Sequence, residues 1–208
     1  MSYRKKKTGS FCGTTINKAC ESGKDCSPAL VAEKEFQVKS IARIVLLLVI
    51  AGIIYSFSSQ TYEEQSLVPM MQKVLPGEPF ADVLSQFKVM YWGKEISVET
   101  KGYYYFLEFF IRKFAHLLLF GLLAVALFRV YLLWKPDRFF GGILVALIGT
   151  GIYAAFDEWH QLQTGGRTPL VNDVFLDLAG GLIALLLYMP FYWWRRIIWR
   201  KKNSDKNL

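Results

Sequence analysis

The stretch FAHLLLFGLLAVALFRVYLLW, residues 114–134, decides the fold of this chain of 208 residues. Residues 114–128 contain one ionisable side chain, His116, and are otherwise apolar or glycine. A hydrocarbon core of about 30 Å needs about 20 helical residues, so a run of this kind predicts a membrane-spanning helix. We expect that helix to cover about residues 110–134.

Three further apolar runs flank this stretch, at about residues 41–57, 139–158 and 173–194. The first follows a leader of forty residues, which is too long for a signal peptide, so we expect a retained helix. Together the runs predict an all-α, multi-pass transmembrane bundle of about four helices with a long outer loop. The chain length suits a single domain, over residues 41–194.

The composition supports a membrane protein over a nucleic-acid-binding protein. The chain is 53% hydrophobic and 16% aromatic and has a formal net charge of +8. Its basic residues lie in the terminal tails and in short loops beside the apolar runs, which is typical of the positive-inside pattern. We therefore expect contact with membrane lipids and no nucleic-acid partner.

Lys and Arg also predict the orientation, because cytoplasmic segments of membrane proteins carry an excess of them. With four spans, three basic segments lie on one side, and the opposite side has a net-acidic loop. This predicts a multi-pass cell-membrane protein with both termini cytoplasmic, a disordered tail over residues 1–40 and a basic tail over residues 195–208. The basic residues are Arg4, Lys5, Lys6, Lys7, Lys18, Lys24, Lys34 and Lys39; Arg129, Lys135 and Arg138; and Arg195, Arg196, Arg200, Lys201, Lys202 and Lys206.

The three cysteines, Cys12, Cys20 and Cys26, all fall in the polar N-terminal tail. Their number is odd and their spacing matches no zinc pattern. The thiols should stay reduced if this tail is cytosolic. The sequence assigns them no role, and it predicts no cofactor.

The outer loop between the first two spans is long enough to have structure of its own. Apolar residues recur at near-helical spacing between Leu67 and Leu75, and again between Phe80 and Met90, after Pro76 and Pro79. Two short amphipathic helices on the outer membrane surface would explain this pattern. Packing of the loop on the outer helix ends would explain it equally well.

Polar side chains gather where the four spans reach the outer side. With the predicted topology, each span contributes a group of polar residues at that rim. The groups are Ser58, Ser59 and Gln60; Arg112, Lys113 and His116; Asp157, Glu158, His160 and Gln161; and Arg167, Asp173 and Asp177. Ionisable residues at membrane depth face the bundle interior, pair with one another and are functional candidates.

Helical spacing places several of these residues on common faces. Residues three or four apart share one helix face, as Arg112 and His116, Asp157 and Gln161, and Asp173 and Asp177 do. In a purely structural network, Arg112 or Arg167 would pair with Asp173 or Asp177, and His116 would bond to Asp157.

The turn between the last two spans, Thr164-Gly165-Gly166-Arg167-Thr168-Pro169, has a local explanation. Its glycines permit a tight reversal. Thr168 can cap the following helix with Pro169 at its first position. That helix would present Asp173 and Asp177 inward, and Gly180 and Gly181 would allow a close helix contact below them.

These residues resemble the VanZ-like family in order and spacing, over about residues 41–188. The matching pieces are Phe57-Ser58-Ser59-Gln60; Arg112-Lys113-Phe114-Ala115-His116 with Gly121; Asp157-Glu158-Trp159-His160-Gln161; Gly166-Arg167; and Asp173-Val174-x-x-Asp177 with Gly180. One departure is Leu118-Leu119-Phe120, where the family often has an acidic residue or a Tyr after the His. The resemblance implies an integral membrane protein of the cell envelope that affects susceptibility to glycopeptide antibiotics of the teicoplanin type. It implies no settled reaction.

Three functions remain open from the residues themselves. The polar group could fix helix packing only. It could bind an envelope lipid or a cell-wall precursor, because Arg side chains suit phosphate and carboxylate oxygens. The candidate ligand-binding residues are Ser59, Gln60, Arg112, Lys113, His116, Asp157, Glu158, Gln161, Arg167, Asp173 and Asp177.

The third possibility is an enzyme acting on a lipid-linked envelope substrate. His116 or His160 would then be the general base, oriented by Asp157 or Asp177. Two His and several carboxylates could also hold a divalent ion. Since no His-x-x-x-His, Cys-x-x-Cys or Gly-x-Ser-x-Gly motif occurs, we predict no metal site and leave catalysis undecided. The oligomeric state cannot be predicted.

Overall fold

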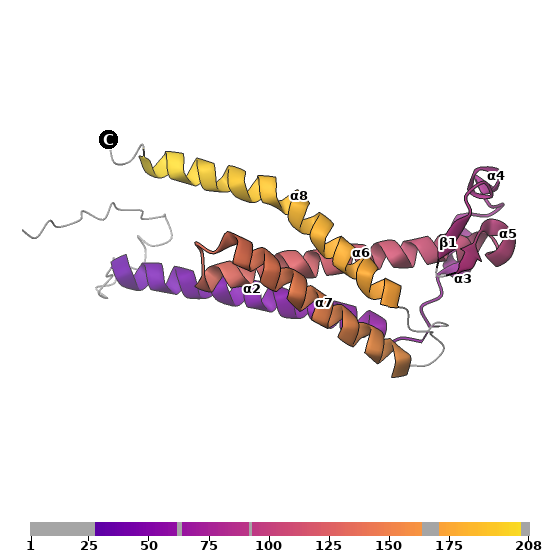
Figure 1. Ribbon diagram of the computed structural model, residues 1–208, viewed down its shortest axis with the longest axis horizontal. Coiled ribbons are helices and arrows are strands. Elements are labelled where there is room, and N and C mark those ends of the chain that lie inside the picture. Colours follow the sequence, from indigo (N-terminus) through magenta and orange to yellow (C-terminus); the bar gives the residue numbers. More distant parts are fainter. Residues whose placement is uncertain (1–27, 62–63, 92, 164–170, 205–208) are drawn as a thin grey trace, which may run out of the picture. The chain divides into compact units, whose positions relative to one another are not determined.

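The computed structural model describes residues 28–61, 64–91, 93–163 and 171–204 (Figure 1). The elements in chain order are α2 (Pro28–Ser58), α3 (Val68–Val74), α4 (Ala81–Leu84), β1 (Val89–Tyr91), β2 (Lys94–Ile96), α5 (Val98–Lys101), α6 (Tyr103–Trp134), α7 (Phe139–Gln163) and α8 (Val171–Ser204). The structure is therefore all-α apart from one small hairpin, as expected. The N-terminal cysteines and the 164–169 turn, including Arg167, lie outside the described residues.

Four of these helices are long and apolar enough to cross a membrane: α2, α6, α7 and α8. All four extend beyond the expected spans, and α2 and α8 extend the farthest. Helix α2 begins at Pro28, so residues 28–40 are helical where the sequence suggested a disordered tail. Helix α8 continues through Pro190 to Ser204. Both extensions are rich in Lys, Arg, Glu or other good helix formers, and each continues a helix that is already nucleated in the span.

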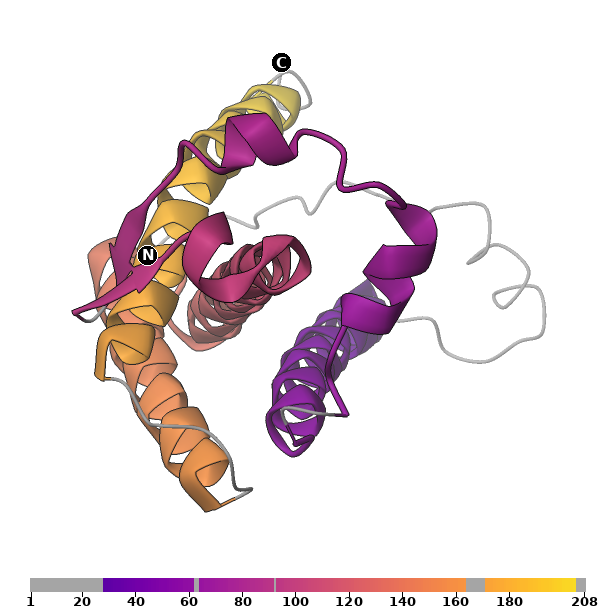
Figure 2. The ribbon, with the colours of Figure 1, turned by 90° about the vertical axis from the view of Figure 1, so that its right-hand side faces the viewer.

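The part of the chain between residues 43 and 189 forms one compact unit. Within this unit α6 is the central helix and lies between α2 and the pair α7 and α8 (Figure 2). In its most apolar stretch, α6 has 39% of the residues buried, against 11% in α2. Large apolar side chains such as Leu48, Leu144 and Leu187 are exposed on the outer helices. In water such a surface would be unfavourable, whereas lipid tails are as apolar as leucine.

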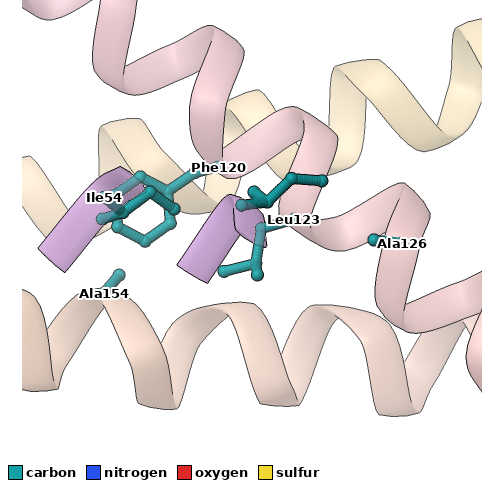
Figure 3. Close-up of a cluster of buried hydrophobic side chains, with 6 residues drawn as sticks. Ile54, Phe120, Leu123, Ala126 and Ala154 are labelled. Atoms are coloured by element: carbon teal, nitrogen blue, oxygen red, sulfur yellow. The ribbon is translucent and has the colours of Figure 1, made fainter. Parts of the chain in front are cut away.

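A dry core joins three of the four spans. Its buried members are Ile50 and Ile54 of α2, Phe120, Leu123 and Ala126 of α6, and Ala154 of α7 (Figure 3). The hydroxyl of Tyr153 in α7 also donates to the carbonyl of Ala51 in α2, at 2.7 Å. A backbone carbonyl within a helix can accept a second hydrogen bond, so this contact fixes α2 against α7 without breaking either helix.

The contact between α6 and α8 depends on two glycines. A Cβ atom on Gly180 would lie 2.4 Å from the carbonyl oxygen of Leu117, and one on Gly121 would lie 2.9 Å from the Cβ of Ala184. Neither distance is tolerable for a real side chain, so the two helix backbones meet directly at this point. The close contact expected at Gly180 is confirmed.

The connection between α2 and α6, residues 59–102, folds over one end of the bundle, and we call it the cap (Figure 1). Helix α3 packs on α6 through the buried side chains of Val68 and Met71. Val89 pairs with Ile96 in the antiparallel hairpin, which the sequence did not predict. The described part of the cap thus consists of one short helix, two single-turn helices and a hairpin. The two amphipathic helices that the sequence suggested as one alternative describe only part of this structure.

Candidate functional site

Polar side chains from all four spans meet at the cap end of the bundle. They are Ser58 of α2, His116 of α6, Asp157 and Gln161 of α7, and Asp177 of α8; all are buried except His116, which is half-buried. We call these five residues the polar cluster. They come from the last turns of α2 and α7 and from the cap-proximal parts of α6 and α8.

The two carboxylates are the centre of the polar cluster. Asp157 Oδ2 accepts a hydrogen bond from Gln161 Nε2 at 2.8 Å, and its other polar neighbours include Ser58, His116 and the nearby His160. Asp177 Oδ1 lies 3.7 Å from His116 Nδ1, which is an ion-pair distance and too long for a hydrogen bond. Since His116 is close to both aspartates, it connects them electrostatically.

The dry core forms the floor of the polar cluster. Ile54, Phe120 and Ala154 each lie three or four residues, or one helical turn, from Ser58, His116 and Asp157 respectively (Figure 3). These apolar side chains separate the carboxylates from the remainder of the membrane span. Charges above such a floor interact more strongly than they would in water.

Aromatic rings border the cluster as well. Tyr55 packs on His160 with a centroid distance of 4.6 Å, and Phe120 stacks on His116 at 6.0 Å. Tyr153 is a neighbour of Asp157. The side chains around the two aspartates are therefore imidazoles, an amide, a hydroxyl and aromatic rings.

A second charged pair lies at the cap side of the cluster and was missed by the sequence analysis. Glu108 is fully buried, accepts from Arg112 at 2.7 Å and accepts from the backbone N–H of Leu67 at 3.0 Å. It thereby joins α6 to the start of α3. The signal was available, since Glu108 is the one acidic residue in the run from Tyr103 to Ile111 and lies four residues before Arg112.

A third contact ties the hairpin to α8. Lys113 Nζ lies 2.5 Å from Asp173 Oδ1, and the hydroxyl of Tyr91 donates to the same oxygen. The Lys113 ammonium also lies 4.9 Å from the centre of the Tyr91 ring. Burial, together with the hydrogen bond to Asp173 and its charge, raises the pKa of Tyr91 above its ordinary value. Tyr91 therefore remains a neutral donor over the whole physiological range.

These contacts differ from the pairing expected for a purely structural network. Arg112 pairs with Glu108, the cation beside Asp173 is Lys113, and His116 makes its ion-pair contact with Asp177. In the described part of the chain Lys113, and not Arg112, is the cation beside Asp173, whereas the other expected partner, Arg167, lies outside that part. Adjacent residues of a helix point about 100° apart. Arg112 consequently shares a face with Glu108, whereas Lys113 faces α8.

The other candidates lie around the cluster. Ser59 and Gln60 are exposed, and the Ser59 hydroxyl, just after the end of α2, donates to the Tyr55 carbonyl of that helix at 2.8 Å. The buried member from this segment is Ser58. Glu158 is half-buried and is an electrostatic neighbour of Tyr91. Within the described ranges, no three His, Cys, Asp or Glu side chains are grouped so that they could hold a metal ion.

The fold and the polar cluster define a class: an α-helical, four-span membrane protein with an acid and imidazole centre at one end of its bundle. A family model described as VanZ/LLP1 matches residues 43–196, which is most of the chain. The chain therefore belongs to the VanZ/LLP1 family. No curated protein and no solved structure gives a significant match.

Proposed function

We propose that this protein binds a polar envelope ligand at the outer leaflet of the cell membrane and thereby lowers susceptibility to glycopeptide antibiotics of the teicoplanin type. The ligand would be the head group of an envelope lipid or a cell-wall precursor. Binding would change which envelope molecules the antibiotic can reach. Both chain termini would lie in the cytoplasm and the cap would lie outside.

One observation carries this proposal: all four spans place a polar side chain in the polar cluster, and those from α2, α7 and α8 are buried. Burying a charge at membrane depth is costly, and such residues usually mark a binding site or a pathway. A bundle that needed only packing could have filled the same positions with apolar side chains at no such cost.

The geometry supports binding more than catalysis. The histidine base expected from the sequence would have to lie within hydrogen-bonding reach of a hydroxyl nucleophile. The Ser58 hydroxyl lies beside Asp157, and neither imidazole hydrogen-bonds to it among the described residues. The contact between His116 and Asp177 orients an imidazole, which serves a binding site as well as a reaction.

The orientation can be tested with the native cysteines. Cys12, Cys20 and Cys26 all precede the first span, and Lys101 of α5 is exposed in the cap. A membrane-impermeant maleimide should leave the wild-type chain unlabelled in intact cells and label it after permeabilisation. A variant with the native cysteines changed to Ser and with Lys101→Cys should show the reverse. Labelling of the native cysteines in intact cells would overturn the proposed orientation.

The link to antibiotic susceptibility can be tested with His116→Asn and Asp177→Asn. Asp177→Asn keeps the side-chain size and His116→Asn replaces the ring with a smaller polar group; each change removes a titratable group of the cluster. We expect normal membrane abundance and a loss of most of the tolerance to teicoplanin that the wild-type chain confers on a sensitive host. Asp82→Asn, at an exposed position of the cap, is the matched control and should keep full tolerance.

Two results would count against this function. The first is wild-type tolerance in both cluster variants at equal abundance. The second is a parallel loss of abundance and tolerance in both, because the cluster would then act through packing alone.

A further inference from the structure

We propose that the polar cluster binds a primary ammonium group, so that its ligand is an amine-bearing envelope molecule and not one held through its phosphate. This inference rests on the proposed function and specifies the ligand of the same site.

The charges around the polar cluster favour a cationic ligand. Arg112 is paired with the buried carboxylate of Glu108, and Lys113 is paired with Asp173. In the described part of the chain, these two basic side chains, which an anionic ligand could use, are therefore already paired with carboxylates of the protein. The remaining charged groups of the cluster are Asp157 and Asp177, with the imidazoles of His116 and His160 beside them. The five residues of the polar cluster thus include two carboxylates and no Lys or Arg side chain.

The hydrogen bonding of Asp177 also favours a charged donor as the ligand. Its side chain is 5% exposed, and its Oδ1 atom has no hydrogen-bond donor among the residues that the structure describes. The ring nitrogen Nδ1 of His116 lies 3.7 Å from this oxygen. Leaving a buried carboxylate oxygen without a donor is costly, and a charged donor compensates for that cost best.

An ammonium group also matches the hydrogen-bond acceptors of the polar cluster. An ammonium has three N–H donors and no acceptor. The acceptors grouped here are Asp177 Oδ1, the carboxylate of Asp157 and the hydroxyl of Ser58, whose Oγ is buried beside Asp157. Three acceptors for three donors match, whereas a phosphate would meet two like-charged carboxylates.

The aromatic rings that border the polar cluster favour a cation as well. Tyr55 and Phe120 pack on the two imidazoles, and Tyr153 neighbours Asp157. Aromatic faces attract cations more strongly where water is excluded. The apolar floor below the cluster excludes water from one side, so carboxylates and rings together favour a positive head group.

The test compares two lipids that differ only at the amine, which is charged in one and acetylated in the other. Purified full-length protein is titrated with phosphatidylethanolamine and with N-acetylated phosphatidylethanolamine of the same acyl chains, and bound lipid is measured by native mass spectrometry. Since a hydrogen bond to a charged group contributes about 1.5–3 kcal/mol, we expect roughly ten- to hundred-fold tighter binding of the amine. Asp177→Asn should remove most of this preference, and Asp82→Asn should keep it.

Competition with free ethanolamine shows whether the site recognises the ammonium group alone or the whole lipid. If it competes with the lipid, the site takes the ammonium group alone; if it does not, the site needs the lipid as well, and both results keep the ammonium assignment. Equal binding of the two lipids by the wild type would overturn it, and this comparison needs no variant to fold. A preference that appears only in Arg167→Gln would also overturn it, because the chain's own guanidinium would then fill the site.

This test can fail while the proposed function stands. A ligand that binds through Asp177 whether or not the ligand's amine is acetylated would overturn the ammonium assignment and leave the proposed function intact. Unchanged teicoplanin tolerance in the cluster variants would overturn the proposed function.

Discussion

Replacing Gly180 with alanine should destabilise the bundle by about 3 kcal/mol, at the upper end of the usual cost of overpacking a core. The added Cβ would lie 2.4 Å from the carbonyl oxygen of Leu117 and 3.0 Å from its carbonyl carbon. Both atoms belong to a helix backbone and cannot rotate away, so α6 and α8 would have to move apart. The melting temperature of the detergent-solubilised protein measures the effect.

Gly52→Ala is the matched control for this change. Gly52 also lies within a span, but a Cβ atom there would meet nothing within 4 Å. Alanine favours a helix over glycine by about 1 kcal/mol, so this variant should be as stable as the wild type or slightly more stable. If Gly180→Ala melted at the temperature of Gly52→Ala, the direct backbone contact between α6 and α8 would be wrong.

Glu108→Ala should have the second large effect, a loss of about 3–5 kcal/mol, which is typical when one partner of a buried ion pair is removed. The Glu108 side chain is 1% exposed and that of Arg112 is 19% exposed, so the change leaves a mostly buried guanidinium without its carboxylate. It also removes the acceptor for the Leu67 N–H at the start of α3. We therefore expect faster proteolysis of the cap as well as a lower melting temperature.

The chain supplies its own control for this pair. Glu35 and Lys39 form an ion pair with the same spacing and a similar N···O distance, 2.6 Å, but their side chains are 61–63% exposed. Exposed pairs of this kind contribute about 0–1 kcal/mol, so Glu35→Ala should change little. Removing both partners of the buried pair, with Arg112→Met added, should restore part of the stability. Equal effects of Glu108→Ala and Glu35→Ala would contradict the buried position of Glu108.

The spans and the meeting of polar residues at one end could be predicted from the sequence. Both depend on local composition: charges avoid the four runs, and polar residues such as His116, Asp157 and Asp177 occur where runs begin or end. Once the topology is fixed, those ends must lie together. The close contact at Gly180 was predictable for the same reason, because a small residue in a span marks a helix contact.

The partners of individual side chains could not be predicted, because they depend on how each helix is rotated about its axis. Helix α2 is apolar on nearly every side, so its sequence does not tell that Ser58 faces inward and Ser59 outward. Arg112 and Lys113 are neighbours in sequence, but they point to different carboxylates. The contact of Tyr91 with Asp173 depends on the fold of the cap, for which the sequence pattern left two alternatives.

The most direct test of the central claim is cross-linking between cysteines placed in the polar cluster. The native cysteines are first replaced by Ser, and a short bifunctional thiol reagent is applied to the protein in native membranes. Ala124→Cys with Gly181→Cys gives a positive control, because the Ala124 Cβ and a Cβ on Gly181 are 3.3 Å apart, close to the separation found in disulfides.

Two cysteine pairs then join the four spans: Ser58→Cys with Asp157→Cys, and His116→Cys with Asp177→Cys. We expect both to cross-link about as fast as the positive control, since each pair joins direct neighbours in the structure. Ser58→Cys with Leu144→Cys, at the far part of α7, should not react. If the control pair cross-linked and both cluster pairs stayed unreacted, the four spans would not bring their polar side chains together.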